Sequence, residues 1–238
     1  MRIKTACLTD RGGRTVNDDT VCVRQEGDCA WAFVGDGLGG YAGGQQASKA
    51  AADAVLAASH RGSLLTDAQL TGAAQQANQA VLAVQRKRQG KMKTTLVFLA
   101  IEDGRARWMH VGDSRLYHFR SGHLQEQTMD HSVSQMAVLM GEITPQEIRF
   151  HEDRNRVLRA LGGDNAKPEL SHTIMLTGGE DVFLLCTDGF WEYVYENEME
   201  DTLRVSQTPQ EWLERMKRLL QERVPEDNDN FTAAAVFC

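Results

Sequence analysis

The sequence has only four prolines, no long apolar run and no closely spaced pair of cysteines. The five cysteines are odd in number and show no Cys-x-x-Cys spacing, so they indicate neither a disulfide framework nor a zinc knuckle. A reducing cytoplasm fits this pattern. A membrane-spanning helix needs roughly 18 apolar residues, and no stretch reaches that length. The first residues also lack the apolar segment of a signal peptide, so we expect a soluble, unprocessed, cytoplasmic protein without membrane insertion.

A basic surface is also lacking, because 33 acidic residues outnumber 26 basic ones and the formal net charge is −7 at pH 7. This balance argues against binding to nucleic acid and against attachment to anionic lipid through a polybasic patch. The composition, 42% hydrophobic and 25% charged, is that of an ordinary globular protein. A chain of 238 residues can bury a substantial core, so we expect one domain spanning residues 1–238.

Short apolar or alternating runs, bounded by turn residues, predict β-strands. The connections through Glu102-Asp103-Gly104 and through Ser121-Gly122 favour antiparallel hairpins. The predicted strands are Ile3–Leu8, Thr20–Val23, Ala30–Gly35, Thr95–Ile101, Arg107–Val111, Arg115–Phe119, Leu124–Gln127, Val182–Cys186 and Phe231–Phe237.

Three segments carry helical patterns: the alanine-rich Gln45–Ser59, Asp67–Lys87 with its single apolar stripe, and a third helix that begins at Thr208. The third start, Thr208-Pro209-Gln210-Glu211, has the residues of a capping box with proline at the first helical position. Hairpins that alternate with long helices predict antiparallel sheets covered by helices, rather than a parallel doubly wound sheet. Residues 131–165 are polar and interrupted by Gly141 and Pro145, which predicts a helical insertion over one edge.

Carboxylates stand at the boundaries of predicted strands in five places. Each one alone is most simply a turn former, because aspartate and asparagine hydrogen-bond their own backbone. Together they suggest more, since strand ends meet in a sheet and clustered carboxylates repel one another unless a cation neutralises them. Hard divalent cations take such oxygen ligands. The five places are Asp36, Asp113, Asp188, Asp229 and the pair Asp18–Asp19.

Asp36 stands among glycines at positions 35, 37, 39, 40, 43 and 44. Glycine allows a close approach to the backbone because it has no Cβ. We therefore hypothesise that the Asp36 carboxylate and the Gly37 carbonyl face the same cation. A nucleotide-binding loop is the alternative, because Gly35, Gly37 and Gly40 fit the spacing G-x-G-x-x-G. The antiparallel hairpins argue against it, and no acidic residue about 20 positions further on ends a second parallel strand.

Six motifs in order resemble the metal-dependent serine/threonine protein phosphatases of type 2C (PPM), in their compact bacterial form. The resemblance extends from about residue 5 to the C-terminus and includes the flap region of the bacterial members at 130–162, D-H-S … G-x-I-T … R-N … A-L-G. The loop D-G-L-G-G-Y looks like that of phosphatases which accompany a kinase in bacterial type VI secretion clusters. The motifs are R14-T-V-N-D-D19, D36-G-L-G-G, G112-D-S-R115, D130-H-S, D188-G-F-W and D229-N-x-T232.

The resemblance implies an α+β fold, a four-layer α/β/β/α sandwich of two antiparallel sheets flanked by helices, with a helical flap at about 131–165. It also implies a binuclear Mn2+ or Mg2+ centre and a looser third ion. Asp36 would bridge two metals as a catalytic residue, with the Gly37 carbonyl and the catalytic Asp188 and Asp229 completing one site. The remaining matches are Asp18 and Asp19 for the other site, Asp113 with Asp188 for the third ion, and Arg14 for the substrate phosphate.

The implied function is a cytoplasmic protein-serine/threonine phosphatase that hydrolyses phosphoserine and phosphothreonine in bacterial signalling. A metal-bridging water or hydroxide would attack phosphorus directly, without a phosphoenzyme. The forked, permanently charged Arg14 suits two phosphoryl oxygens. The partners would be phosphorylated proteins and a cognate serine/threonine kinase, and we expect a monomer. The alternative is a phosphoprotein-binding regulatory pseudophosphatase, which would usually lack one of the metal-binding aspartates.

Two positions depart from the family pattern. Leu38 stands where some eukaryotic relatives have a histidine that can protonate the leaving alkoxide, so the leaving-group acid is open. Glu192 stands where many relatives have aspartate, which puts its part in a third-metal site in doubt. We expect His131 to have a structural role, with Ser132, in capping the first flap helix. The segment 154–156, Arg-Asn-Arg, fits a substrate contact and a solvated face equally well.

Overall fold

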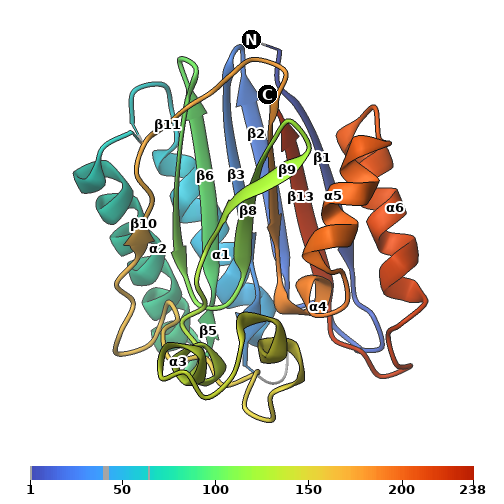
Figure 1. The fold of residues 1–238 in the computed structure, drawn as a ribbon. Coiled ribbons are helices and arrows are strands. Elements are labelled where there is room, and N and C mark those ends of the chain that lie inside the picture. The colour runs from blue at the N-terminus through green and yellow to red at the C-terminus, as the bar shows by residue number, and fades with distance from the viewer. Residues whose placement is uncertain (1, 40–42, 64) are drawn as a thin grey trace.

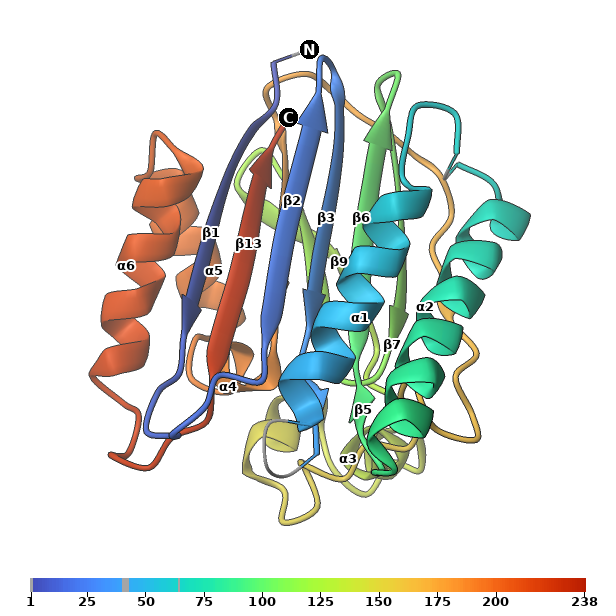
Figure 2. The same ribbon diagram turned by 180° about the vertical axis from the view of Figure 1, so that it is seen from behind.

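The computed structural model describes residues 2–39, 43–63 and 65–238, which form two stacked antiparallel sheets with helices on both outer faces (Figures 1 and 2). One sheet has the strand order β1-β13-β12-β8-β9 and the other the order β10-β7-β6-β3-β2. Strand β11 also pairs with β7, and β4 with β5. This is the α+β, four-layer α/β/β/α arrangement that the resemblance implied, so that prediction is confirmed.

The strands lie close to their predicted positions. Type I′ hairpins need positive φ at both turn residues, and Asp103 and Gly104 have φ of 50° and 70° between β6 and β7. The strand bounds are β1 Lys4–Asp10, β2 Thr20–Glu26, β3 Cys29–Gly35, β4 Gly37–Leu38, β5 Lys93–Thr94, β6 Leu96–Glu102, β7 Arg105–Val111, β8 Arg115–Arg120, β9 His123–Gln127, β10 Glu169–Leu170, β11 Ile174–Met175, β12 Asp181–Cys186 and β13 Phe231–Phe237.

Helices α1 and α2 cover one sheet, and α5 and α6 cover the other (Figure 2). The start of α6 is as predicted, because Pro209 is its first residue and the Thr208 hydroxyl accepts from the Glu211 N–H at 3.1 Å. The Glu211 carboxylate accepts from the Gln207 N–H instead of that of Thr208, so the capping box is only half formed. The helix bounds are α1 Gly43–Ala58, α2 Asp67–Arg88, α3 Val133–Leu139, the 3₁₀ helix η1 Pro145–Phe150, α4 Asp188–Trp191, α5 Glu196–Arg204 and α6 Pro209–Gln221.

Strand β3 illustrates why the sandwich has three core layers. All seven of its residues are buried. Trp31 and Phe33 pack with α1 and α2, while Ala32 and Val34 face the other sheet and its Phe183. A strand that is covered on both faces has no need of polar alternation, which explains the continuous apolar run before Asp36.

The insertion at residues 131–165 contains α3 and η1, and lies at the end of the sandwich opposite both termini (Figure 1). Ser132 is the N-cap of α3 as expected, because its hydroxyl accepts from the Gln135 N–H at 3.2 Å. At the far end of the insertion, Leu161 exchanges two backbone hydrogen bonds with Thr94, at 3.1 and 2.9 Å. This end of the flap is therefore fastened to β5, directly before β6.

Within the described parts of the chain, no helix combines the length and the apolar character needed to cross a membrane. All five cysteines belong to these parts and are free thiols.

Candidate active site

The carboxylates at the strand ends gather at the flap end of the sandwich. An open cavity of about 680 Å³ is lined by Arg14, Asp18, Asp36, Gly37 and Asp229, with Leu38 and Asn230 among its other residues. Asp19, Asp113 and Asp188 are close enough to Asp36 to repel its negative charge. The structure thus brings together every predicted metal-binding residue, although these residues come from both sheets. Gly40, which belongs to the predicted glycine loop, lies outside the described residues.

The backbone of Asp36 is held by two threonines that sequence reasoning left without a role. Thr95 accepts from the Asp36 N–H through its hydroxyl at 2.8 Å and donates its own N–H to the Asp36 carbonyl at 2.9 Å. The Thr94 hydroxyl donates to the same carbonyl at 2.8 Å. Both threonines are fully buried. The sequence signal for this role was the pair of polar residues at the start of an apolar strand. Because the two threonines bind only the backbone of Asp36, its carboxylate is left free for the site.

Gly37 and Gly44 are needed for close packing of two backbone segments. A Cβ on Gly37 would lie 2.2 Å from the Gly44 carbonyl oxygen and 2.5 Å from that of Asp18. A Cβ on Gly44 would in turn lie 2.2 Å from the Gly37 carbonyl oxygen. The start of α1 can therefore reach the Asp36 segment only if both residues are glycine.

Asp18 and Asp19 have different surroundings. One Asp18 carboxylate oxygen, Oδ1, accepts from the Gln45 N–H in the first turn of α1 at 2.9 Å. Asp19 is buried, and its Oδ2 accepts from the Thr187 hydroxyl at 2.9 Å. Burial, together with the negative charge of Asp229, raises the pKa of Asp19 to about 7. Hydrogen bonds from the hydroxyls of Thr232 and Thr187 oppose this shift. Asp19 therefore connects β2 of one sheet with the end of β12 in the other.

Arg14 and Asp229 form a two-point ion pair. Arg14 Nε and Nη2 donate to the two oxygens of Asp229 at 3.2 and 3.1 Å. Both side chains are about half exposed, at 56% and 50%, so the pair contributes little stability. The carboxylate of Asp229 raises the pKa of Arg14 through this hydrogen bond. The predicted phosphate-binding arginine thus lies at the rim of the carboxylate cluster.

Asp113 has a buried oxygen without a partner. Its side chain is 2% exposed, and Oδ1 finds no hydrogen-bond donor among the described residues. Burial raises the pKa of Asp113 to about 7, with a further contribution from the charge of Asp130. Buried polar atoms in native proteins nearly always have a partner. This unpartnered, buried carboxylate oxygen fits a ligand of a cation.

Glu192, the other residue considered for a third ion, is engaged by the flap. Its Oε1 lies 3.1 Å from Arg154 Nε. Burial raises the pKa of Glu192, while the positive charge of Arg154 opposes that shift. Arg156 pairs instead with Asp153 at the surface. Of the two arginines in the 154–156 segment, only Arg154 turns towards the carboxylate cluster.

The carboxylates together make a site that requires positive charge. Burial raises the pKa of Asp36 well above its usual value, and Asp188, Asp19, Asp113 and Asp229 raise it further. Burial also raises the pKa of Asp188, and neighbouring carboxylates, Asp113 first, add to the shift. Divalent cations remove both costs, because they replace the lost hydration and cancel the repulsion. The residues present therefore fit a centre of Mn2+ or Mg2+ ions.

A family model described as protein phosphatase 2C matches residues 10–227. The chain is 32% identical over 213 residues to the serine/threonine protein phosphatase PstP of Mycobacterium tuberculosis. The aligned region covers 85% of this chain but only 39% of PstP, which is the longer protein. The crystal structure of the PstP catalytic domain with two manganese ions superposes with a TM-score of 0.83 at 30% identity, covering 99% of this chain and 97% of that one. PppA, a regulatory component of type VI secretion in Pseudomonas aeruginosa, superposes with a TM-score of 0.82 at 28% identity, covering 100% and 98% of the two chains.

Proposed function

The chain belongs to the protein phosphatase 2C family, and we propose that it is a metal-dependent phosphatase of phosphoserine and phosphothreonine residues in proteins. The observation that carries this proposal is the gathering of buried carboxylates from both sheets around Asp36, beside a half-exposed arginine. We further propose that residues 1–238 work as one domain, with 131–165 as its flap.

The proposed centre uses two Mn2+ or Mg2+ ions, the metals of this family. Asp36 would hold both, with the Gly37 carbonyl, Asp188 and Asp229 on one side and Asp18 and Asp19 on the other. When bound, such ions lower the pKa of a water between them and neutralise charge on the phosphoryl group. The protein's part is to fix the carboxylates, and the buried backbone contacts of Asp36 with Thr94 and Thr95 do so before substrate arrives.

We propose that Arg14, which lines the cavity, binds the phosphoryl group. Its planar guanidinium can donate to two phosphate oxygens at once, as it donates to two Asp229 oxygens in this structure. Leu38 lines the same cavity and offers no proton to the leaving alkoxide. The leaving group must then be protonated by solvent or another acid of the site.

The partners we propose are a phosphorylated protein and the serine/threonine kinase that acts on it. The likeness to PppA supports a setting in type VI secretion, and the likeness to PstP supports general bacterial signalling. A kinase needs ATP, which supports a cytoplasmic setting for the pair. That the protein acts as a monomer stays a prediction.

The decisive experiment is hydrolysis of a phosphothreonine peptide by the purified protein with Mn2+, with Mg2+ and with EDTA. We expect turnover with the metals and none with EDTA. A folded protein that binds Mn2+ yet hydrolyses nothing would support the pseudophosphatase alternative instead. Each position at which the proposed two-metal centre needs an aspartate has one, which favours the enzyme.

Replacing Arg14 tests the phosphate-binding role. Charged hydrogen bonds are each worth about 1.5–3 kcal/mol, so we expect Arg14→Ala to lower kcat/KM for the phosphopeptide roughly 10- to 100-fold, and Arg14→Lys to lie between. Arg215→Ala, which removes an exposed arginine paired with Glu211 on α6, is the matched control. Unchanged kcat/KM in Arg14→Ala would show that the phosphate is bound elsewhere.

A further inference from the structure

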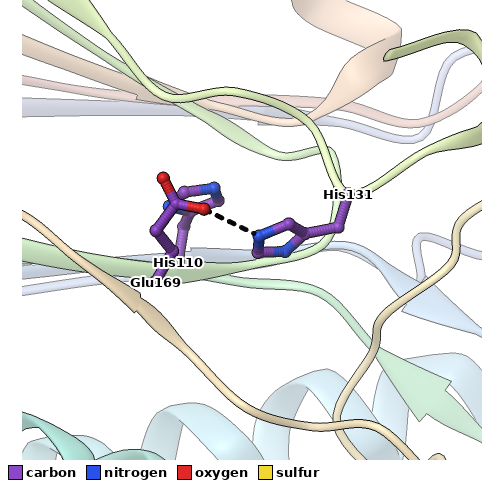
Figure 3. A group of neighbouring side chains, drawn as sticks. All are labelled: His110, His131 and Glu169. Carbon is purple, nitrogen blue, oxygen red and sulfur yellow. Dashed lines mark hydrogen bonds and ion pairs between the residues drawn. The ribbon is translucent and has the colours of Figure 1, made fainter. Parts of the chain in front are cut away.

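Two histidines and a glutamate form a cluster next to Gly112, the residue before Asp113. His110 comes from β7, His131 from the start of the flap and Glu169 from β10 (Figure 3). The two imidazole rings are stacked, with centroids 4.6 Å apart and planes inclined by 8°. His131 Nε2 lies 3.3 Å from Glu169 Oε2. Both histidines are buried, and burial lowers the pKa of each, that of His131 to about 4.

The side chain of His131 binds the backbone beside Asp113. Its Nδ1 accepts from the Gly112 N–H at 3.1 Å, and the His131 N–H donates to the Gly112 carbonyl at 2.9 Å. His131 therefore holds Gly112 by both of its backbone polar groups. The contact differs from the helix-capping role expected from sequence, which Ser132 alone fulfils.

A metal ion on this cluster does not fit the hydrogen bonds. Because Nδ1 of His131 accepts a hydrogen bond from the Gly112 N–H, the proton of the neutral ring lies on Nε2, where it donates to Glu169 and leaves no lone pair for a metal. Arg159 Nη1 adds a positive charge 3.2 Å from the same nitrogen. Stacked parallel rings also cannot both direct an in-plane lone pair at one ion. The cluster is suited to holding a ring in one orientation and tautomer.

Gly112 can be positioned only through its backbone. It has φ of +109°, and a Cβ there would lie 2.6 Å from Thr95 Cγ2. The next residue, Asp113, is held on its other side by the Trp191 Nε1–H, which donates to the Asp113 carbonyl at 2.9 Å. Its carboxylate is the one with a buried, unpartnered oxygen. The direction of that carboxylate thus depends on how the backbone at 112–113 is held.

We propose that His131 is a positioning residue, which fixes the Asp113 carboxylate for the third, looser cation through its Nδ1 bond to the Gly112 backbone. His110 and Glu169 serve this role by holding the His131 ring by stacking and by a hydrogen bond at Nε2. The inference rests on the proposed function, since it assumes a cation at Asp113.

Two substitutions separate this role from packing alone. In His131→Asn, the side-chain oxygen stands where Nδ1 stood and can still accept from Gly112. In His131→Gln, the polar group moves one bond further out, towards Glu169, and Gly112 loses its acceptor. Binding of Mn2+ is counted by the electron paramagnetic resonance of the free ion across a titration. Partners behind a metal ligand typically change metal affinity roughly 10- to 100-fold, so we expect the weakest Mn2+ site to weaken by that factor in His131→Gln and by far less in His131→Asn.

The same substitution in an Asp113→Asn background completes the test. If His131 acts through Asp113, His131→Gln has no further effect on Mn2+ binding once Asp113 is neutral. Equal affinities of the Gln and Asn variants for the weakest ion, or an equal loss in both backgrounds, would overturn the proposal. Urea unfolding of each metal-free variant checks that the compared proteins are folded. Metal binding is measured without substrate. A wild type that hydrolyses no phosphopeptide would therefore refute the proposed function, but the Mn2+ affinities of the His131 variants could still be interpreted.

Discussion

Replacing Asp36 with asparagine should abolish metal-dependent hydrolysis while making the metal-free protein more stable. Metal ions supply several kcal/mol of transition-state stabilisation, so loss of the carboxylate that would hold both should lower kcat about a thousandfold or more. The stability gain arises because Asp36 is buried among four other carboxylates that repel its charge. At pH 7.5 we therefore expect the free energy of unfolding in EDTA to rise.

The gain should depend on pH in a definite direction. Folding raises the pKa of Asp36 above the ordinary value of 3.8, so the wild type loses stability as pH rises above about 4, where the unfolded carboxyl has already ionised. Near pH 4 the carboxyl is protonated in the folded state and only about half ionised in the unfolded state, so asparagine brings little advantage. Urea unfolding in EDTA at pH 4.5 and 7.5 measures the difference, which should be larger at 7.5.

A matched control and a metal titration complete this test. Asp53→Asn removes an exposed carboxylate that pairs with Lys49 on α1, and should change neither activity nor unfolding by more than about 0.5 kcal/mol. Added Mn2+ should stabilise the wild type and not Asp36→Asn, because only a bound ion shifts the unfolding equilibrium. An Asp36→Asn protein that retains wild-type turnover would show that the metal centre lies elsewhere.

Removing Asp130 should destabilise the protein by about 3–5 kcal/mol, the usual cost of leaving one member of a buried ion pair alone. Asp130 accepts two hydrogen bonds from Arg115, both at 2.8 Å, and the side chains are 2% and 3% exposed. The Arg115 guanidinium also lies over the Trp191 ring, 3.5 Å from its centroid. In Asp130→Ala that positive charge would stay buried without its carboxylate. Urea unfolding of the metal-free protein measures the loss.

Two comparisons show whether the loss comes from the unpaired charge. Asp201→Ala breaks an exposed pair with Arg204 on α5, and should cost at most about 1 kcal/mol. The double variant Arg115→Met with Asp130→Ala removes both charges and should recover part of the stability, since apolar groups often replace a buried pair at little cost. A loss below about 1 kcal/mol in Asp130→Ala would mean that solvent or Glu196, whose Oε1 lies 3.8 Å from Arg115 Nη1, compensates the charge of Arg115.

The predicted helices and strands were those with a clear period or a clear boundary. Helix α2 begins at Asp67 as predicted and ends one residue beyond the prediction, because its apolar stripe and capping residues are local signals. Helix α5, Glu196–Arg204, was not predicted, because only Met199 and Leu203 of its nine residues are buried and so little period is visible. Strands β10 and β11, two residues each, form only where β7 offers them an edge.

The order of the aspartate motifs by itself determined the resemblance to the family, because a motif depends on residue type and spacing; the resemblance in turn implied the fold class and the candidate site residues. Only the tertiary structure decided which side chains meet. Arg14 and Asp229 pair although 215 positions separate them, and Arg154 rather than Arg156 turns to Glu192. His131 holds Gly112 instead of capping a helix. Such contacts depend on how the two sheets stack and on where the flap is fastened. No local stretch of sequence determines either of these features.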